Sequence, residues 1–249
     1  MKTYLYRDLS VIELPDRLLV TACDSSAGVG EKQEDELHVP TKYVSIFATR
    51  VCLFELLACG CQIIGLANTI CNEMEPTGKH LIDGIHEELK RAGLPELLIN
   101  GSTEENFKTV MTGFGITIIG TTQELNLSPS QAGDLIVCIG KPKVGNEVVL
   151  ENDTEIAAYP DLAFLTSCDL VNEVVPCGSK GILYEAQNLT AIYQLQLSSL
   201  TDALDLKKSC GPATTLIASV KENGLAHLQK HFGGRLNVIG QLTKKPEAI

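Results

Sequence analysis

The chain has 249 residues, which is enough for one large domain or two modest ones, and its 44% hydrophobic and 20% charged residues are typical of a globular protein. Its net charge of -11 argues against nucleic acid and anionic membranes as partners, because such a surface repels phosphates and acidic headgroups. No apolar run approaches the roughly 20 residues that span a bilayer. The N-terminus, MKTYLYRDLS, has no apolar secretory region, so we expect a protein without a membrane span or leader.

The nine cysteines are scattered and include no CxxC pair. Cys52 and Cys138 lie within apolar runs, where a thiol behaves as a small hydrophobic side chain. Cys59 and Cys61 are close in sequence, but no second ligand pair accompanies them as in a zinc site. This usage predicts reduced core thiols in a cytoplasmic protein.

In the first half, an apolar strand at 17–23 ends on Asp24 and leads through the turn SSAGVG into a charged loop at 31–38. Apolar residues at steps of three and four then predict a helix from Pro40 to Gly60. We expect a strand at 62–70, a helix opened by Pro76-Thr77-Gly78 that ends near Arg91, a buried strand at 97–100 and a third strand at 109–120.

A polar linker at 121–133 predicts a domain boundary, with domains at 1–125 and 131–249. The second half repeats the rhythm of strands and helices. We expect strands at 134–140, 171–175 and 192–197, a helix from about Ser179 to Asn188, and a final strand–helix–strand unit at 213–220, 222–232 and 235–242. This alternation predicts a mixed-sheet α+β protein.

Three segments place acidic or polar residues beside glycine or at the end of an element. They are Asp24 in TACDSSAGVGEK, Glu55 on the helix RVCLFELLACGC, and the run LINGSTEENF at 98–107. Each alone is also typical of an ordinary turn or a solvated helix flank. Together they favour a magnesium–phosphate site, because Mg²⁺ takes oxygen ligands and bridges substrate phosphates.

The order of these segments resembles the AIR synthase (PurM-like) superfamily over nearly the whole chain. In the second half, VVPCGSKGILYEAQNL (174–189) and CGPATTLIASV (210–220) are similar to that family's glycine-led turns. The resemblance implies a PurM-like two-domain architecture, with a ferredoxin-like N-terminal domain for ATP, metal and dimerisation and a C-terminal α/β domain. Within the family, the runs TRVCLFELLACGC, CNEMEPTGKH and NGSTEENF look most like α-ribazole kinase, which phosphorylates a cobamide nucleoside.

The resemblance implies an ATP- and Mg²⁺-dependent kinase acting on a small nucleoside, with α-ribazole as the expected substrate. Asp24 and Glu55 would be catalytic and, with Glu104, would hold the metal. The residues expected to bind the nucleotide are Gly28, Gly30, Lys32, Asn100, Gly101, Ser102 and Thr103. Those expected to bind the substrate are Asn68, Asn72, Thr77, Gly78, Gly178, Ser179 and Lys180. Lys79 is a second lysine near the expected phosphates, and the amides at the start of its helix favour an anion.

Three positions depart from the family pattern. Glu55 stands where most members have an aspartate, Ser102 stands where kinase members have an acid, and the first sixteen residues contain no glycine. Two alternatives stay open. One is another ATP-dependent enzyme of the same family, a synthase, a ligase or a thiamine-phosphate-kinase-like enzyme, and the other, which Ser102 makes possible, is a non-catalytic nucleotide-binding relative. The family also implies a homodimer formed through the N-terminal sheets.

Two other chemistries lack support. His227 and His231 form an i, i+4 pair, but no acid accompanies them as in a zinc-protease signature. The chain also contains no GxSxG elbow, so a serine hydrolase is unsupported.

Overall fold

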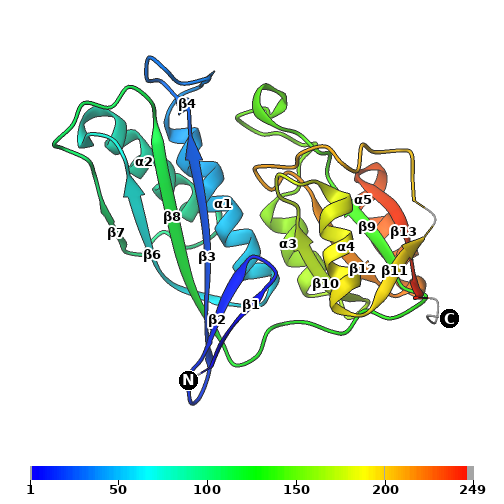
Figure 1. The fold of residues 1–249 in the computed structure, drawn as a ribbon. Coiled ribbons are helices and arrows are strands. Elements are labelled where there is room, and N and C mark those ends of the chain that lie inside the picture. Colours follow the sequence, from blue (N-terminus) through cyan, green and yellow to red (C-terminus); the bar gives the residue numbers. More distant parts are fainter. Residues whose placement is uncertain (1, 199, 246–249) are drawn as a thin grey trace. The chain divides into compact units, whose positions relative to one another are not determined.

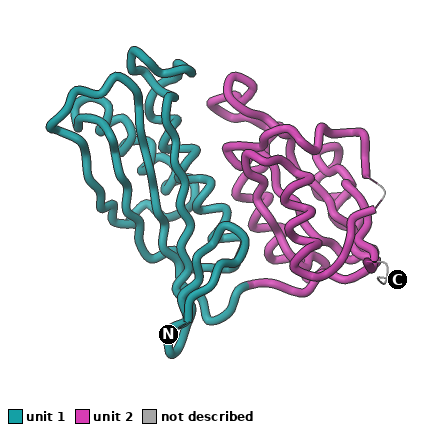
Figure 2. The backbone as a smooth tube through the Cα atoms, in the orientation of Figure 1, with its two compact units in different colours: residues 1–125 teal, residues 126–249 magenta. Residues whose placement is uncertain are grey.

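The computed structural model describes residues 2–198 and 200–245 (Figure 1). The chain divides into two compact units, 1–125 and 126–249 (Figure 2). The domains expected from the sequence were 1–125 and 131–249. Each unit has its own sheet and its own core, and each is described by itself.

Unit 1 is built on a six-stranded sheet in the order β1-β2-β3-β8-β6-β7. Neighbouring strands are antiparallel except β6 and β7, which are parallel. The strands are β1 (Thr3–Tyr6), β2 (Leu9–Glu13), β3 (Leu18–Ala27), β6 (Gln62–Ile70), β7 (Ile99–Ser102) and β8 (Gly113–Thr122), and a separate parallel pair joins β4 (Val29–Gly30) to β5 (Leu37–His38).

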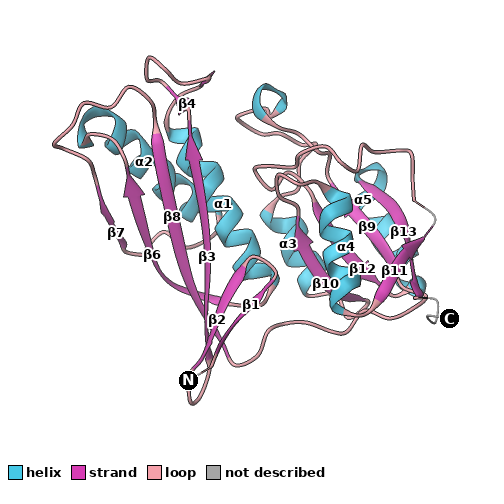
Figure 3. Cartoon of the chain, viewed as in Figure 1, coloured by secondary structure: helices cyan, strands magenta, loops and turns pink. Residues whose placement is uncertain are grey.

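Helices α1 (Lys42–Ala58) and α2 (Lys79–Arg91) form the second layer of unit 1 (Figure 3). Helix α1 contacts β3, β6 and β8, and α2 packs against α1. Every second residue of β8, from Phe114 to Ile118, is buried beneath this layer, as expected for a sheet with one covered face. Helix α1 ends just before Gly60, whose φ of +74° is the left-handed conformation expected after a helix.

The strand 62–70 and both helices of unit 1 agree with their predictions, whereas three other features differ. Strand β3 continues to Ala27 because it pairs with β8 over its whole length, so Asp24 lies within the strand rather than at its tip. The strand predicted as buried at 97–100 is the edge strand 99–102, and Leu98 beside it is 87% exposed. The N-terminal residues, for which no element was predicted, form the β1–β2 hairpin.

Unit 2 contains a five-stranded sheet in the order β10-β12-β9-β13-β11, and all four pairings are antiparallel. Its elements are β9 (Leu135–Ile139), α3 (Tyr159–Thr166), β10 (Val171–Pro176), α4 (Ile182–Ile192), β11 (Leu195–Ser198), β12 (Leu216–Val220), α5 (Leu225–Phe232) and β13 (Leu236–Lys244). The predicted alternation of strands and helices is confirmed, and α3 is an additional helix. No helix in the described ranges is long and apolar enough to cross a membrane.

Gly84 allows the close approach of α2 to α1. A Cβ atom at this position would overlap the carbonyl oxygen of Lys42 and the hydroxyl of Ser45, both on α1. We therefore expect Gly84→Ala to lower the free energy of unfolding by about 1–3 kcal/mol in urea titrations, although alanine is the better helix former. His86→Ala, at an exposed position of the same helix, is the control and should change stability by less than about 0.5 kcal/mol. A stabilised Gly84→Ala variant would contradict this packing.

Candidate functional site

Three loops meet at one end of unit 1. Strands β3 and β6 both end there and β8 begins there, since β8 residues Gly113 and Phe114 pair with Ala27 and Ile70. Helices α1 and α2 also start at this end, at the top of unit 1 in Figure 1. We call segments 28–41, 71–78 and 103–112 the loop cluster. It contains most of the residues that the sequence predicted to bind nucleotide or substrate in unit 1.

Asp35 ties the first loop to the third. Its buried carboxylate accepts hydrogen bonds from the amide and hydroxyl of Thr112, both at 2.7 Å, and from the amide of Lys32 at 2.8 Å. Gly30, with a φ of +148°, lies against this carboxylate and Thr112, and a Cβ atom there would overlap both. The close approach therefore requires glycine at position 30, whether or not a ligand is bound.

Lys32 ties the first loop to the second. Its ammonium group donates to the Glu73 carboxylate at 2.6 Å and to the Thr109 carbonyl at 3.2 Å. Thr77 donates its hydroxyl to the same carboxylate at 2.5 Å. Burial alone would raise the pKa of Glu73, but the hydrogen bonds from Lys32 and Thr77 outweigh it and the pKa is lowered. A phosphate that binds Lys32 must therefore compete with Glu73.

Asn72 ties the second loop to the third. Its buried amide donates to the Thr109 hydroxyl at 2.6 Å and to the Met111 carbonyl at 2.9 Å, and its side-chain oxygen accepts from the Gly113 amide at 2.9 Å. Its carbonyl also accepts the amide of Glu104 at 3.0 Å. The side-chain amide of Asn72, which was predicted to bind the substrate, therefore already makes hydrogen bonds within the protein.

The start of α2 faces this cluster. Thr77 and Gly78 form the turn before the helix, where the Gly78 amide donates to the Glu73 carbonyl at 2.9 Å. The first amides of a helix carry partial positive charge and favour an anion. Lys79, the next residue, is exposed and pairs with Asp83 at 2.9 Å. Thr103 reaches the same turn through Glu105, which accepts hydrogen bonds from the Thr103 hydroxyl and the Met74 amide, both at 2.9 Å.

Sequence reasoning missed the acidic residues that hold the cluster together. Asp35, Glu31 and Glu73 were read as part of a charged loop or were not considered. Glu31 accepts hydrogen bonds from the amide and the hydroxyl of Thr41 at the start of α1, both at 2.9 Å. The hydrogen bond from the Thr41 amide is the main cause of the lowered pKa of Glu31. In the sequence, Glu31 follows Gly30 and Glu73 lies shortly before the expected helix start, whereas no local signal marks Asp35.

A row of paired residues crosses the sheet below the cluster. Asp24 pairs with Ile116, Ile116 with Asn68, and Asn68 with Gly101. Paired residues point to the same face, so Asp24 and Asn68 both face the helices, two strand spacings or about 10 Å apart. Asn68 is 4% exposed and donates to the Asn100 carbonyl at 3.2 Å.

The segment 100–103 presents alternate residues to opposite faces. Gly101 lies on the helix side against the Asn68 amide, where a Cβ atom would overlap that side chain. Asn100 and Ser102, which pair with Ala67 and Thr69, are exposed on the opposite face. The four residues predicted to bind one nucleotide therefore do not share one face.

Asp24 is half-buried beside Cys52 of α1, a thiol whose pKa is raised by burial and by the nearby Asp24 and Glu55 carboxylates. Burial is also the main cause of the raised pKa of Asp24, and a hydrogen bond with the Ser25 backbone only partly offsets it. In the described part of the chain no basic side chain pairs with Asp24. A cation bound beside the Asp24 carboxylate would therefore stabilise its charged form.

Glu55 has a different environment. It lies 3.6 Å from the guanidinium of Arg7, and these side chains are only 13% and 4% exposed. Arg7 also donates to the Cys59 sulfur at 3.1 Å. Glu104 caps its own loop by accepting the amides of Asn106 and Phe107 at 2.7 and 3.2 Å. Over residues 2–198 and 200–245, no three His, Cys, Asp or Glu side chains form a group able to hold a metal ion. The structure does not assemble the predicted ligands Asp24, Glu55 and Glu104 into one ready-made site.

In unit 2, Gly178, Ser179 and Lys180 form the turn that precedes α4. The Gly178 carbonyl accepts the amides of Gly181 at 3.2 Å and Cys210 at 3.1 Å. Lys180 donates to the Tyr184 hydroxyl at 3.0 Å, which lowers the pKa of that tyrosine. Backbone hydrogen bonds therefore hold this turn to the segment around Cys210.

The sequence matches no known protein-family profile and no curated protein. Solved structures, in contrast, resemble the chain over most of its length. Thiamine monophosphate kinase from Aquifex aeolicus superposes with a TM-score of 0.67 at 11% identity, covering 96% of this chain and 89% of that one. The enzyme from Stenotrophomonas maltophilia K279a gives 0.66 at 15% identity, covering 98% and 89%. The hydrogenase maturation protein HypE from E. coli gives 0.63 at 15% identity, covering 91% and 80%.

The chain has the PurM-like fold. The likeness extends through both units of the chain, so the predicted two-domain α+β architecture is confirmed. At 11–15% identity, the similarity to these structures shows the fold alone. Another similar structure is AaThiL complexed with AMPPCP and TMP.

The raised pKa of Asp24 predicts the direction in which a substitution at this position changes stability. A carboxyl group whose pKa is higher in the folded than in the unfolded state stabilises the fold when protonated, and that contribution is lost as the pH rises from the ordinary value of 3.8 through the folded pKa. We therefore expect Asp24→Asn to raise the urea midpoint at pH 7, and the difference should vanish below pH 3.8. Asp8→Asn, at an exposed turn of the same unit, should leave the midpoint unchanged. A lower midpoint for Asp24→Asn at pH 7 would show that the carboxylate is stabilised in the fold.

Proposed function

We propose that this protein is an ATP- and Mg²⁺-dependent kinase that phosphorylates a nucleoside hydroxyl, converting α-ribazole to α-ribazole 5′-phosphate for the lower ligand of cobamides. The observation that carries the kinase part is the PurM-like fold, shared with thiamine monophosphate kinases over nearly the full length of both chains. A relative of that fold solved with the ATP analogue AMPPCP supports ATP as the phosphate donor. The choice of α-ribazole is supported by the resemblance of TRVCLFELLACGC, CNEMEPTGKH and NGSTEENF to α-ribazole kinases.

The loop cluster is the proposed place for the nucleotide phosphates. It combines the amides at the start of α2 with the ammonium group of Lys32, and both favour an anion. Phosphoryl transfer depends mostly on positioning and on stabilising negative charge, which these groups can supply. Binding requires Lys32 to exchange Glu73 for a phosphate, so we expect the nucleotide to rearrange the hydrogen bonds of the first two loops.

Asp24 is the proposed carboxylate for Mg²⁺. A nucleotide-bound Mg²⁺ needs only one or two protein carboxylates, because phosphates and water complete its ligands. Asp24 lacks a basic partner in the described ranges, whereas Glu55, the second predicted acid, already pairs with Arg7. Bound Mg²⁺ would supply the positive charge that offsets the phosphate charge during transfer.

The direct test is incubation of the full chain with ATP, Mg²⁺ and α-ribazole, followed by mass spectrometry and separate assays of ADP and free phosphate. We expect phosphorylated α-ribazole and ADP in equal amounts, with no free phosphate above the blank. Free phosphate equal to ADP would instead support a synthase that uses a phosphorylated intermediate. Tight ATP binding without turnover would support the non-catalytic alternative, which the Arg7–Glu55 pair and the exposed Ser102 favour.

Asp24→Asn should lower kcat by about 100-fold or more, because it removes negative charge that must face the metal–phosphate group. The variant should remain folded, since the same change is expected to stabilise the protein at pH 7. Asp8→Asn should retain full activity. Unchanged turnover by a folded Asp24→Asn variant would contradict the role of Asp24.

We also propose that the chain forms a homodimer through the face of the unit 1 sheet opposite the helices. On β3, β6 and β8 this face carries only uncharged residues, including Thr21, Cys23 and Ser25 on β3, Ala67 and Thr69 on β6, and Gly115, Thr117 and Ile119 on β8. A wide sheet face without charge is unusual in contact with water, and it fits a second copy of itself. Nucleic acid and membranes are not proposed partners.

The homodimer predicts a mass of two 26.9 kDa chains by light scattering at micromolar concentration. Thr117 lies at the centre of the open face, between Cys23 and Ala67. Thr117→Lys should shift the protein to a monomer while its circular dichroism stays unchanged, because burying an unpaired charge at an interface is costly. His86→Lys, on the helix side, is the matched control and should remain dimeric. A monomeric wild-type chain would rule out this interface.

A further inference from the structure

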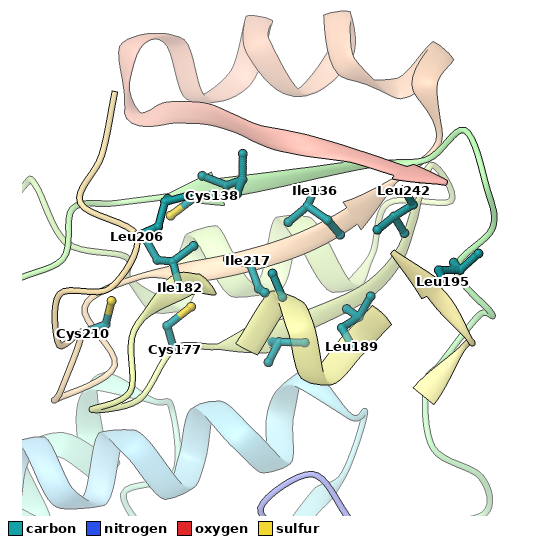
Figure 4. Packing of buried hydrophobic residues seen from close by; sticks show 13 residues of the cluster. Ile136, Cys138, Cys177, Ile182, Leu189, Leu195, Leu206, Cys210, Ile217 and Leu242 are labelled. Carbon is teal, nitrogen blue, oxygen red and sulfur yellow. The ribbon is translucent and has the colours of Figure 1, made fainter. Parts of the chain in front are cut away.

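Three cysteines lie together in the core of unit 2. Cys138, Cys177 and Cys210 are fully buried in one cluster that also contains Ile182 and Ile217 (Figure 4). They come from three different places: β9, the end of β10, and the segment that leads into β12. The proposed kinase chemistry uses none of these thiols.

Cys177 and Cys210 are neighbours in space although 33 positions separate them in sequence. The Cys210 amide donates to the carbonyl of Gly178 at 3.1 Å, so residue 210 lies next to the residue that follows Cys177. The Cys177 amide in turn donates to the Thr215 carbonyl at 3.0 Å. Both side chains belong to the same buried cluster, and Figure 4 shows Cys177 and Cys210 on neighbouring segments of it. The hydrogen bond between residues 210 and 178 therefore holds the backbones of the two cysteines side by side, which a disulfide between them requires.

The two thiols differ in acidity. The hydrogen bond from Cys177 is the main cause of the lowered pKa of Cys210. Burial is the main cause of the raised pKa of Cys177, and burial also raises the pKa of Cys138. The lowered pKa favours Cys210 as the attacking sulfur of the pair.

We propose that Cys177 and Cys210 are a redox site that forms a reversible disulfide when the protein meets a peroxide. The Cys210 thiolate attacks one oxygen of hydrogen peroxide, the O–O bond breaks, and the departing hydroxide takes a proton to leave as water. Cys210 is then a sulfenic acid. The Cys177 sulfur attacks this sulfur, its thiol proton and the sulfenic hydroxyl leave as a second water, and the S–S bond forms. Two thiols are oxidised and one peroxide is reduced to two waters.

The position of Cys210 explains why this pair, rather than Cys138, would react. Residues 200–215 contain no helix or strand, so local opening of this segment gives a peroxide access to Cys210. Cys138 lies in β9, which pairs with β12 on one side and β13 on the other. Exposing Cys138 would require the centre of the sheet to open.

The disulfide would join the Gly178–Lys180 turn to the segment around Cys210 and enclose α4 in a covalent loop. A cross-link of this kind restricts the unfolded chain, so the oxidised protein should unfold at a higher temperature. A thiol reductant should reverse this shift.

The test treats the reduced full chain with hydrogen peroxide, blocks the remaining thiols under denaturing conditions and maps the peptides by mass spectrometry. We expect two of the nine thiols to escape blocking, a Cys177–Cys210 cross-linked peptide, and a rise in Tm that a reductant removes. A disulfide that includes Cys138, or oxidation elsewhere while Cys177 and Cys210 remain thiols, would overturn the proposal.

Two variants separate the roles of the sulfurs. Cys177→Ser should leave Cys210 as a sulfenic acid that dimedone traps, because no resolving thiol remains. Cys210→Ser should leave Cys177 reduced under the same treatment. Cys168→Ser, at a half-buried cysteine of the same unit, is the control and should form the cross-link as the wild type does. The peptide map of the wild-type chain decides the proposal even if a core variant fails to fold.

Discussion

The pairing of β3 with β8 determines which face of the unit 1 sheet each residue of its central strands occupies. This ladder extends without interruption from the Leu18–Thr122 pair to the Ala27–Gly113 pair, and β6 continues it on the other side of β8. Because side chains alternate along a strand, the same register places Asp24, Ile116 and Asn68 beneath the helices and leaves an uncharged opposite face. A slip of one residue would turn the Asp24 carboxylate away from the helix layer.

The ladder ends where the loop cluster begins, and the cluster depends on it. Loops carry backbone amides and carbonyls that need partners when buried. Asp35 and Asn72 provide such partners for backbone groups of the third loop, and Glu73 joins the first two loops through the ammonium group of Lys32. These bonds hold the loops in place before any ligand arrives. The phosphate site proposed here thus has an ordered framework, in which Lys32 must still exchange its Glu73 partner.

Unit 2 shows the same principle with different chemistry. Its antiparallel sheet and α4 bring Cys177 and Cys210 together in an apolar core. Low polarity there disfavours an isolated thiolate, so the acidity of Cys210 depends on its neighbouring thiol. In each unit, the groups on which the proposals rest thus have surroundings set by residues far away in the chain.

Elements with a strong local pattern could be predicted from the sequence alone. The apolar stripe of α1, the run at 62–70 and the glycine and proline signals around α2 depend on neighbouring residues, so they could be read directly. The resemblance of whole segments also predicted the PurM-like fold, which the solved structures confirm. The β1–β2 hairpin and α3 were missed because their apolar patterns are short and weak.

Which of the predicted residues lie together depends on long-range contacts that local pattern does not contain. The sequence could not show that Arg7 lies beside Glu55, or that Glu73 holds Lys32, because these pairs are 48 and 41 positions apart. Nor could it show that Gly101, and not Ser102, faces the helices, since that depends on the register of β7 with β6. Composition and local pattern are properties of short segments, whereas a site depends on long-range pairing, which is set only when the sheet forms.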